Sequence, residues 1–408
     1  SMAAVRSLCG VLPNVFSNIS NTGLKGKLVL QHGVRCMSSK ADTFKASEVE
    51  IEFCKPEQLH PKPAVKDLVF GQTFTDHMLE VEWTESDGWG KPKISPFHNF
   101  SMHPAAKVLH YATELFEGLK SYRTCAGDIV LFRPEMNMAR MVRTAGRASL
   151  PTFEGKELIT LIKKLISIDQ QWVPHAESSS LYVRPAIISH EEVLKVEQPR
   201  KALLFVILSP TGPYFSSGYN PVSLLADPNY VRAWPGGCGD AKMGSNYAPT
   251  LAIQKEAMKK GLSQVLWLYG PDHRVTEVGA MNIMIFIDKG NGERELVTPP
   301  LDGLILPGVT RASLLELARS WREFEVNERD ITMAEVLQLS KEGRLLEMFG
   351  CGTAAVVCPV GEIHYEGQVI RIPTMDHERP VTTRLYDAIT DIQYGRTPHP
   401  WAVNINSS

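Results

Sequence analysis

The sequence predicts a mixed α+β fold, of the α/β class in the broad sense, and three observations lead to this prediction. The chain has 408 residues, which is too long for one ordinary hydrophobic core and favours two domains. Strand-like and amphipathic helical segments follow one another in the first half. The second half contains several short strand-like runs joined by turn sequences.

Composition excludes several classes of protein. Apolar residues make up 43% and charged residues 22% of the chain, as in an ordinary soluble globular enzyme. The longest apolar runs, 202–208 and 283–287, are far shorter than the roughly 20 residues of a membrane helix, so no membrane partner is expected. The seven cysteines form no Cys-x-x-Cys motif and no His-Glu-x-x-His occurs, which predicts reduced thiols and no metal site.

Residues 1–41 have the composition of a mitochondrial transit peptide. They are rich in serine, contain no Asp or Glu, and carry Arg6, Lys25, Lys27, Arg35 and Lys40. Without them the chain keeps 38 basic and 45 acidic residues, a net charge of −7. No basic excess then remains to neutralise phosphates, which argues against a nucleic-acid partner.

The first domain is expected over 42–211. Prolines at 56, 61 and 63 predict an irregular arm at its start. The expected elements are then a strand over 68–83, a strand or turn over 105–118, a strand over 128–132, helices over 136–149 and 157–172, and strands over 180–188 and 202–208.

Two polar patterns lie in this half. Arg140, Arg143 and Arg147 share one side of the predicted helix, because they are spaced at i, i+3 and i+7. Such a stripe is usually solvated, and the alternative is contact with an anion. Tyr182 and Arg184 are two residues apart in a predicted strand, so they project from the same face.

A stretch rich in Pro, Gly and Ser marks the domain boundary, with a linker over 212–220 and a second domain over 221–408. Strand-like runs follow at 222–225, 265–269, 276–278, 281–287 and 295–298. Turn sequences at Pro271-Asp272 and Asn291-Gly292 join the later runs, which predicts an antiparallel meander.

The loop Arg232–Thr250 has Lys242 at its centre and four glycines around it, at 236, 237, 239 and 244. Glycine is used where the backbone turns sharply or approaches a ligand closely. A helix is expected from Asn246, so Lys242 lies at a helix entrance, where a partly desolvated lysine can attack a carbonyl. The alternative is an ordinary surface lysine in a glycine-rich loop.

Two glycine-containing segments predict anion sites. An apolar strand over 304–306 and a Pro307-Gly308 turn lead into a helix with Thr310 in its first turn, and free N–H groups there would bind phosphate. A second helix entrance is expected over 349–355. Each segment alone is also consistent with an ordinary helix start.

Glu277 is an acidic residue in an otherwise apolar meander. If it is buried it needs a partner, and the alternative is a strand residue that faces solvent. A reactive lysine, a buried acid and phosphate-binding turns together meet the requirements of pyridoxal 5'-phosphate.

Five segments also resemble the branched-chain-amino-acid aminotransferases, closest to the vertebrate mitochondrial type. They are 232–250, Trp267–His273, Thr276–Gly279, Leu306–Arg311 and Leu115–Gly118, and the similarity covers nearly everything after residue 41. The resemblance implies a fold-type IV pyridoxal-phosphate enzyme. It also implies a homodimer, with a small N-terminal α+β domain and a larger C-terminal α+β pseudo-barrel domain around the cofactor.

The resemblance assigns roles to residues at matching positions. Lys242 would bind the cofactor covalently and carry the proton, Glu277 would hold the pyridine nitrogen, and Tyr247 would bind the phenolic oxygen. The phosphate and ring would be held by Arg140, Leu306, Val309, Thr310, Gly352 and Thr353. The substrate would be contacted by Phe70, Tyr111, Phe116, Tyr182, Tyr214, Ala280 and Ala354, by Arg184 at a distal carboxylate, and by Leu194 and Val196 of the other subunit.

Two departures from the family pattern are visible. The first Cys of the redox pair of mitochondrial members is Ala355 here, so no thiol switch with Cys358 is expected, and Cys351 replaces a serine. Ala280 replaces a threonine and removes a hydroxyl expected near the substrate carboxylate.

The sequence therefore predicts a mitochondrial-matrix transaminase that exchanges amino groups between leucine, isoleucine or valine and 2-oxoglutarate in a ping-pong cycle. Such an enzyme serves branched-chain amino-acid catabolism or biosynthesis. Whether it has partner enzymes in the matrix is left open. Alternatives are a D-amino-acid transaminase or lyase of the same fold, and a cofactor-loaded binding or scaffold protein with weak catalysis. A dehydrogenase is disfavoured, because no Gly-x-Gly-x-x-Gly follows a strand at 236–239.

Overall fold

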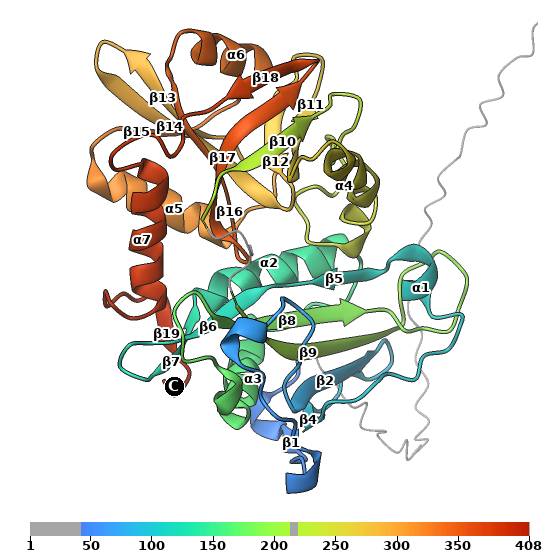
Figure 1. Cartoon of the computed structure of the whole chain (residues 1–408). Coiled ribbons are helices and arrows are strands. Elements are labelled where there is room, and N and C mark those ends of the chain that lie inside the picture. The colour runs from blue at the N-terminus through green and yellow to red at the C-terminus, as the bar shows by residue number, and fades with distance from the viewer. Residues whose placement is uncertain (1–41, 213–218, 408) are drawn as a thin grey trace, which may run out of the picture. The chain divides into compact units, whose positions relative to one another are not determined.

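The computed structural model describes residues 42–212 and 219–407. The expected transit peptide at 1–41, Tyr214 and most of the expected linker lie outside the described residues. Two β-sheets organise the described chain (Figure 1). No helix in the described ranges is long and apolar enough to cross a membrane.

The first sheet has ten strands in the described part of the chain. Across it lie β1 (Glu50–Ile51), β4 (Lys93–Pro96), β2 (His77–Thr84), β9 (Lys201–Thr211), β8 (Ser180–Ile188), β6 (Leu119–Arg123), β7 (Ile129–Phe132) and β19 (Ala402–Asn404). Two further strands attach to this row, β3 (Gly88–Trp89) to β2 and β5 (Glu114–Phe116) to β8. The C-terminal strand β19 thus returns to the sheet formed by the first half of the chain.

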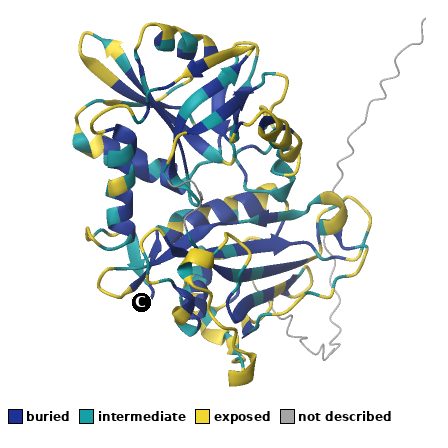
Figure 2. Cartoon of the chain, viewed as in Figure 1, coloured by how far each residue is buried: buried dark blue, intermediate teal, exposed yellow. Residues whose placement is uncertain are grey.

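The two faces of the first sheet have different roles. Leu181, Val183 and Ile187 of β8 pack in one buried cluster with Met138 and Met141 of α2 (Pro134–Arg147) and with α3 (Gly155–Ile168). Residues of β8 at even positions, such as Tyr182 and Arg184, point to the opposite face because side chains alternate along a strand. Figure 2 shows the strands of this sheet as largely buried.

The second sheet has nine strands among the described residues. Its order is β12 (Arg274–Val278), β11 (Gln264–Tyr269), β10 (Val222–Ala226), β17 (Val356–Tyr365), β16 (Leu345–Gly352), β13 (Met281–Gly290), β14 (Glu293–Thr298) and β15 (Glu325–Glu328), with β18 (Gln368–Arg371) on β17. Because β12 also pairs with β13, the six strands β10, β11, β12, β13, β16 and β17 close into a barrel-like ring. The predicted meander is confirmed, since β11, β12, β13 and β14 pair antiparallel in succession.

Helices pack against both faces of this sheet. Alternate residues of β13 face opposite sides: Ile283 and Ile285 join a cluster with α6 (Met333–Lys341), whereas Met284 and Phe286 face α5 (Val309–Trp321) and α7 (Val381–Gln393). The latter cluster also contains side chains of β7, so it joins the two sheets. A further helix, α4 (Thr250–Lys259), packs on β11.

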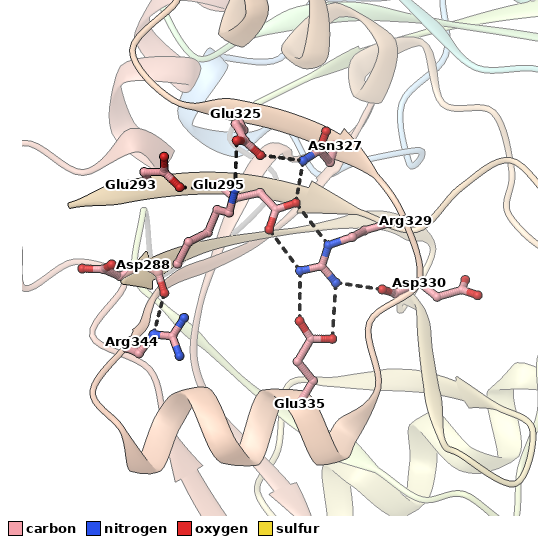
Figure 3. A network of polar contacts seen from close by, with 10 residues as sticks. Asp288, Glu293, Glu295, Glu325, Asn327, Arg329, Asp330, Glu335 and Arg344 are labelled. Atoms are coloured by element: carbon pink, nitrogen blue, oxygen red, sulfur yellow. Dashed lines mark hydrogen bonds and ion pairs between the residues drawn. The ribbon is translucent and has the colours of Figure 1, made fainter. Parts of the chain in front are cut away.

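An ion-pair network fixes the edge of the second sheet. Glu295 of β14 accepts hydrogen bonds from Arg329 at 3.0 and 3.1 Å and from Asn327 at 2.7 Å, and Arg329 also binds Glu335 of α6 at 2.9 Å (Figure 3). Burial acts to raise the pKa of Glu295, but these donors outweigh it and lower that pKa. The network therefore holds α6 against β14 with a carboxylate that stays charged.

Several predicted elements differ from the structure. The strand predicted from Leu68 begins at His77, because a turn over 70–72, with Gly71 at φ +72°, interrupts the extended chain. Residues 304–306 form a bend and not a strand. The helix entrance predicted over 349–355 is wrong: Phe349–Gly352 end β16, and Thr353–Ala355 form the turn into β17.

Helix positions also differ in two places. The helix predicted from Asn246 begins at Thr250, after a 3-10 turn over Gly244–Asn246. The stretch 105–118, expected as strand or turn, contains the short helix α1 (Lys107–Tyr111) before β5. The predicted irregular arm is confirmed in character, since it holds only β1 and short 3-10 turns at Ala46–Glu48 and Pro56–Gln58.

Candidate active site

A pocket lies between the Tyr182 face of the first sheet and the ends of β12, β13 and β16. Most of the residues singled out in the sequence line it: Phe70, Phe116, Arg140, Tyr182, Arg184, Lys242, Tyr247, Glu277, Ala280, Leu306, Val309, Thr310, Gly352, Thr353 and Ala354. These positions are spread over more than 280 residues of sequence, and folding brings them together around one space.

Lys242 is held in this pocket by its own loop and by the first sheet. Its backbone N–H donates to Oγ1 of Thr144 at 3.2 Å, and its carbonyl accepts from the N–H of Phe116 at 3.1 Å. Its ammonium Nζ lies 3.1 Å from the hydroxyl of Tyr247 and 4.7 Å from the ring centre of Phe116. The lysine is therefore aimed into the pocket and is not a solvated surface side chain.

The glycines at 239 and 244 allow this loop to lie close to its neighbours. A Cβ on Gly239 would be 2.6 Å from the carbonyl oxygen of Leu304, and one on Gly244 would be 1.7 Å from Oε1 of Glu114. Both values are far below any real contact. Because the carbonyl oxygen near Gly239 belongs to the backbone, glycine is required at 239, whereas at 244 a larger residue would have to displace the end of the Glu114 side chain.

Glu277 lies on β12 at the far end of the pocket and is only 3% exposed. Its Oε1 accepts from the N–H of Leu306 at 2.8 Å, and its Oε2 lies 3.0 Å from Nε of Arg232. Burial raises the pKa of Glu277 even though Arg232 and the Leu306 N–H act in the opposite direction. The prediction that Glu277 is buried and paired is therefore confirmed. A cationic group bound in the pocket would favour the charged form of its carboxylate.

The start of α5 lines another part of the pocket. Gly308 precedes the helix and supplies no side-chain cap, so the first N–H groups, including those of Val309 and Thr310, lack helical partners. A Cβ on Gly308 would lie 2.0 Å from Oδ1 of Asn282, so a larger residue would displace the Asn282 side chain. Thr310 and, from the β16–β17 turn, Thr353 add hydroxyl groups. This donor set suits a phosphate group.

Arg140 reaches the same region from α2. Its Nε and Nη2 bind the carboxylate of Glu117 at 2.7 and 2.8 Å, and its Nη1 donates to the carbonyl of Pro307 at 3.0 Å. Glu117 is fully buried, and although burial acts to raise its pKa, Arg140 outweighs this effect and lowers it. Arg140 is thus a fixed charge that lines the pocket.

The other two arginines of the stripe contact the Lys242 loop. Nη1 of Arg143 lies 2.7 Å from Oδ2 of Asp240, and Nη2 of Arg147 lies 3.4 Å from the carbonyl of Gly237. Both side chains nevertheless remain exposed, so the usual expectation of solvated arginines holds for Arg143 and Arg147, whereas Arg140 is buried and lines the pocket. The stripe faces the loop because α2 runs beneath it.

Aromatic rings and one arginine form the remaining wall. The rings of Phe70 and Tyr182 meet edge to face at 4.9 Å, and the guanidinium of Arg184 lies 4.6 Å from the ring centre of Phe116. Arg184 donates to the Tyr182 hydroxyl at 3.1 Å, while its buried Nε has no hydrogen-bond partner. This wall offers apolar area together with one incompletely satisfied cation.

Three predicted substrate residues do not line the pocket of the single chain. Leu194 and Val196 are 59% and 79% exposed, and Tyr111 is 40% exposed and donates its hydroxyl to the carbonyl of Leu194. The remaining one, Tyr214, lies outside the described residues.

Comparison with known proteins identifies the family. The family described as amino-transferase class IV matches residues 114–363, which is more than half of the chain. The chain belongs to this family.

Curated relatives support the assignment of this class IV aminotransferase. The cytosolic branched-chain-amino-acid aminotransferase of Mus musculus is 54% identical, over 91% of this chain and 96% of its own length. The mitochondrial branched-chain-amino-acid aminotransferase of Rattus norvegicus is 52% identical, over 91% and 94%. Close relatives thus include both cytosolic and mitochondrial forms.

The fold is also that of a known structure. The branched-chain amino acid aminotransferase of Escherichia coli matches with a TM-score of 0.65 over 80% of this chain and 99% of its own, at 24% identity. The predicted fold-type IV architecture of this class IV aminotransferase is therefore confirmed. In the described ranges, no group of His, Cys, Asp or Glu side chains is arranged to hold a metal ion.

Several residues of the aminotransferase site were not predicted from the sequence. Arg232 and Glu117 pair with Glu277 and Arg140 of the pocket, and Gly118, Met281 and Asn282 line it. Arg232 and Glu117 lie in the quoted motifs, so their motif positions were a usable signal. Their ion pairs join residues far apart in sequence, which no local pattern reveals.

Proposed function

We propose that this protein is a branched-chain-amino-acid aminotransferase that uses pyridoxal 5'-phosphate. The observation that carries the proposal is the joint lining of one pocket by Lys242, hydrogen-bonded to Tyr247, and by the buried carboxylate of Glu277. This combination fits the cofactor, whose ring nitrogen needs a buried anion and whose aldehyde needs an amine.

The residues of the pocket fit the cofactor at each end. The N–H groups at the start of α5, with Thr310, Thr353 and Arg140, would hold the phosphate. Leu306 would pack against the ring, and Tyr247 would donate to its phenolic oxygen. When bound, pyridoxal phosphate supplies an aldehyde that accepts the amino group and a ring that withdraws electrons from Cα.

The chain's own residues would then do three things. Lys242 would take the proton from Cα of the donor amino acid in one half of the cycle and deliver a proton to the corresponding carbon of the 2-oxo acid in the other half. The hydroxyl of Tyr247, 3.1 Å away, would orient its Nζ. Glu277 would keep a negative charge at the far end of the pocket. The walls at Phe70, Phe116 and Tyr182 would exclude water from the substrate side chain.

Substrate preference follows from the wall chemistry. Burial of a branched aliphatic side chain against the aromatic rings favours binding by roughly 25 cal/mol per Å² of apolar area. Arg184, whose buried Nε has no partner, would meet the distal carboxylate of glutamate. The same pocket would thus accept both an apolar donor and a dicarboxylate.

We further propose a homodimer, a small domain over 42–211, a linker over 212–220 and a large cofactor-binding domain over 221–408. The exposure of Leu194 and Val196 supports the dimer, because these apolar side chains need a cover. The composition of residues 1–41 supports a location in the mitochondrial matrix.

The test is turnover of the purified, cofactor-loaded protein with L-leucine and 2-oxoglutarate. The expected result is stoichiometric formation of glutamate and 4-methyl-2-oxopentanoate, and no activity with D-leucine. Bound cofactor without glutamate formation would favour the binding or scaffold alternative. Turnover with D-leucine alone, or release of ammonia, would favour a D-amino-acid transaminase or a lyase.

A further inference from the structure

A buried lysine without a counter-ion lies directly behind the pocket. Lys120 of β6 is only 8% exposed, and no carboxylate of the described chain is paired with it. Burying an ammonium group without an anion is strongly unfavourable in general. We therefore expect Lys120 to have a function that offsets the unfavourable burial of its charge.

The side chain of Lys120 crosses from the first sheet to the second. It lies opposite Tyr182 in the β6–β8 pairing, so it projects from the sheet face that also carries Tyr182. Its Nζ donates to the carbonyl oxygen of Ala354 at 2.7 Å. Ala354 belongs to the Thr353–Ala355 turn between β16 and β17, and that turn lines the pocket.

The turn separates two cavities. Ala354 lines the pocket with Lys242 and also a second cavity, where Lys120 lies with Tyr122, Tyr219, Tyr386, Tyr394 and Gln393. Lys120 thus holds the turn from the side opposite to the one that faces the substrate. The hydrogen bond fixes the peptide that follows Ala354, and it places the charge of Lys120 beside a residue that lines the pocket.

We propose that Lys120 is a positioning residue that holds the Thr353–Ala355 turn and, through its charge, strengthens binding of the substrate's α-carboxylate there. The inference rests on the proposed function, because an amino acid and its 2-oxo acid share this carboxylate. Such a charge also answers a deficit in this chain, since Ala280 supplies no hydroxyl to the carboxylate.

The charge state of Lys120 gives a second observable. Burial lowers the pKa of Lys120 to about 8. The tyrosines that face it, Tyr122, Tyr219, Tyr386 and Tyr394, have pKa values raised by burial and remain neutral at that pH. Lys120 is therefore the group of its cavity that changes charge near pH 8, and it is cationic below that value.

The test compares two ligands of nearly the same shape, the anionic 4-methylvalerate and the neutral 4-methylvaleramide. Their dissociation constants are measured by calorimetry on the cofactor-loaded wild type and on Lys120→Met. The expected result is about tenfold weaker binding of the acid by Lys120→Met, in line with the loss of an interaction with a charged group, and unchanged binding of the amide. Binding of the acid to the wild type should also weaken above about pH 8.

The matched control is Arg133→Met. Arg133 also joins the two halves of the chain, through Ser313 at 3.1 Å and Glu316 at 2.9 Å, and its described side-chain hydrogen bonds do not involve the turn. It should lower stability without changing the preference for acid over amide. Equal effects of Lys120→Met on acid and amide, or no effect on either, would overturn the inference.

The remaining outcomes also decide. If Lys120→Met does not fold, the wild type still tests the inference: a dissociation constant for the acid that does not change between pH 7 and about pH 9 would overturn it. In addition, Lys120→Arg should retain binding of the acid. If the wild type binds the acid with this pH dependence but shows no turnover, the proposed function fails while the role of Lys120 stands.

Discussion

The two cysteines of the β16–β17 hairpin lie on opposite faces of the sheet. Cys351 pairs with Val357, and Cys358 pairs with Gly350, so the two sulfur atoms point away from each other. Cys351 packs in the cluster with α5 and α7, whereas Cys358 packs in the cluster with α6. A disulfide between them would require the hairpin to unfold.

Both thiols should therefore be unreactive. Burial raises the pKa of Cys351 and of Cys358 to about 12, so at pH 8 about one thiol in ten thousand is the reactive thiolate, and the fraction grows only as the pH rises further. We expect that mild peroxide at pH 8 causes no loss of activity that dithiothreitol restores.

The measurement is activity together with mass-spectrometric mapping of modified cysteines. Cys125, which is exposed, is the internal control and should be modified first. The expectation would be contradicted if peroxide inactivated both the wild type and Cys125→Ser and dithiothreitol restored the activity of both.

At the scale of single residues, sequence reasoning found the groups that carry chemistry but not their supports. Lys242 and Glu277 could be recognised because a lysine among glycines and an acid among apolar residues break a local pattern. The ion pairs Arg232–Glu277 and Arg140–Glu117, and the contact of Lys120 with Ala354, join distant segments. Only the folded chain reveals which charge neutralises which.

At the scale of elements, the Lys242 loop depends on its fit against residue 304. A Cβ on Gly239 would lie 2.6 Å from the carbonyl oxygen of Leu304 and 2.3 Å from Cβ of Ala233. Because a backbone atom cannot move away cheaply, Gly239→Ala should destabilise the protein by about 1–3 kcal/mol and weaken cofactor retention. Urea denaturation and cofactor absorbance after dialysis measure the two effects.

The matched control for Gly239→Ala is Gly146→Ala. Gly146 lies in α2 with no atom within 4 Å of the added carbon, so the change should stabilise by about 0.5–1 kcal/mol. Equal stability of Gly239→Ala and the wild type would show that the loop is free to shift.

The elements that the sequence failed to predict share a physical cause. The segment 349–355 contains Gly350, Gly352 and Thr353, which are as compatible with a strand end and turn as with a helix start. The segment becomes a strand end and turn because β16 pairs with β13 on one side and with β17 on the other. The strand β13 is remote in sequence, so a local pattern cannot reveal this pairing. By contrast, helices α2 and α3 were predicted because amphipathic spacing is a local property.

At the scale of the whole molecule, the exposed side chains of Leu194 and Val196 are the basis for the proposed dimer. A two-fold dimer buries two copies of Leu194, one from each subunit. Leu194→Glu should therefore weaken the free energy of association by about 3 kcal/mol or more. We expect the variant to sediment as a monomer at micromolar concentration and to lose activity, because these residues are proposed to complete the partner's pocket.

The control for this variant is Val369→Glu on β18, which replaces a residue that is 52% exposed on the second sheet. It should leave both sedimentation and activity unchanged. A fully active monomer of Leu194→Glu would contradict the proposed shared site.

The most direct test of the account is the position of the cofactor on the chain. Borohydride reduction of the protein loaded with pyridoxal phosphate, followed by peptide mass spectrometry, should place the pyridoxyl phosphate group on Lys242 alone. Lys242→Ala should carry no label and should not transaminate leucine. Labelling of another lysine in place of Lys242, or transamination by Lys242→Ala, would contradict the account.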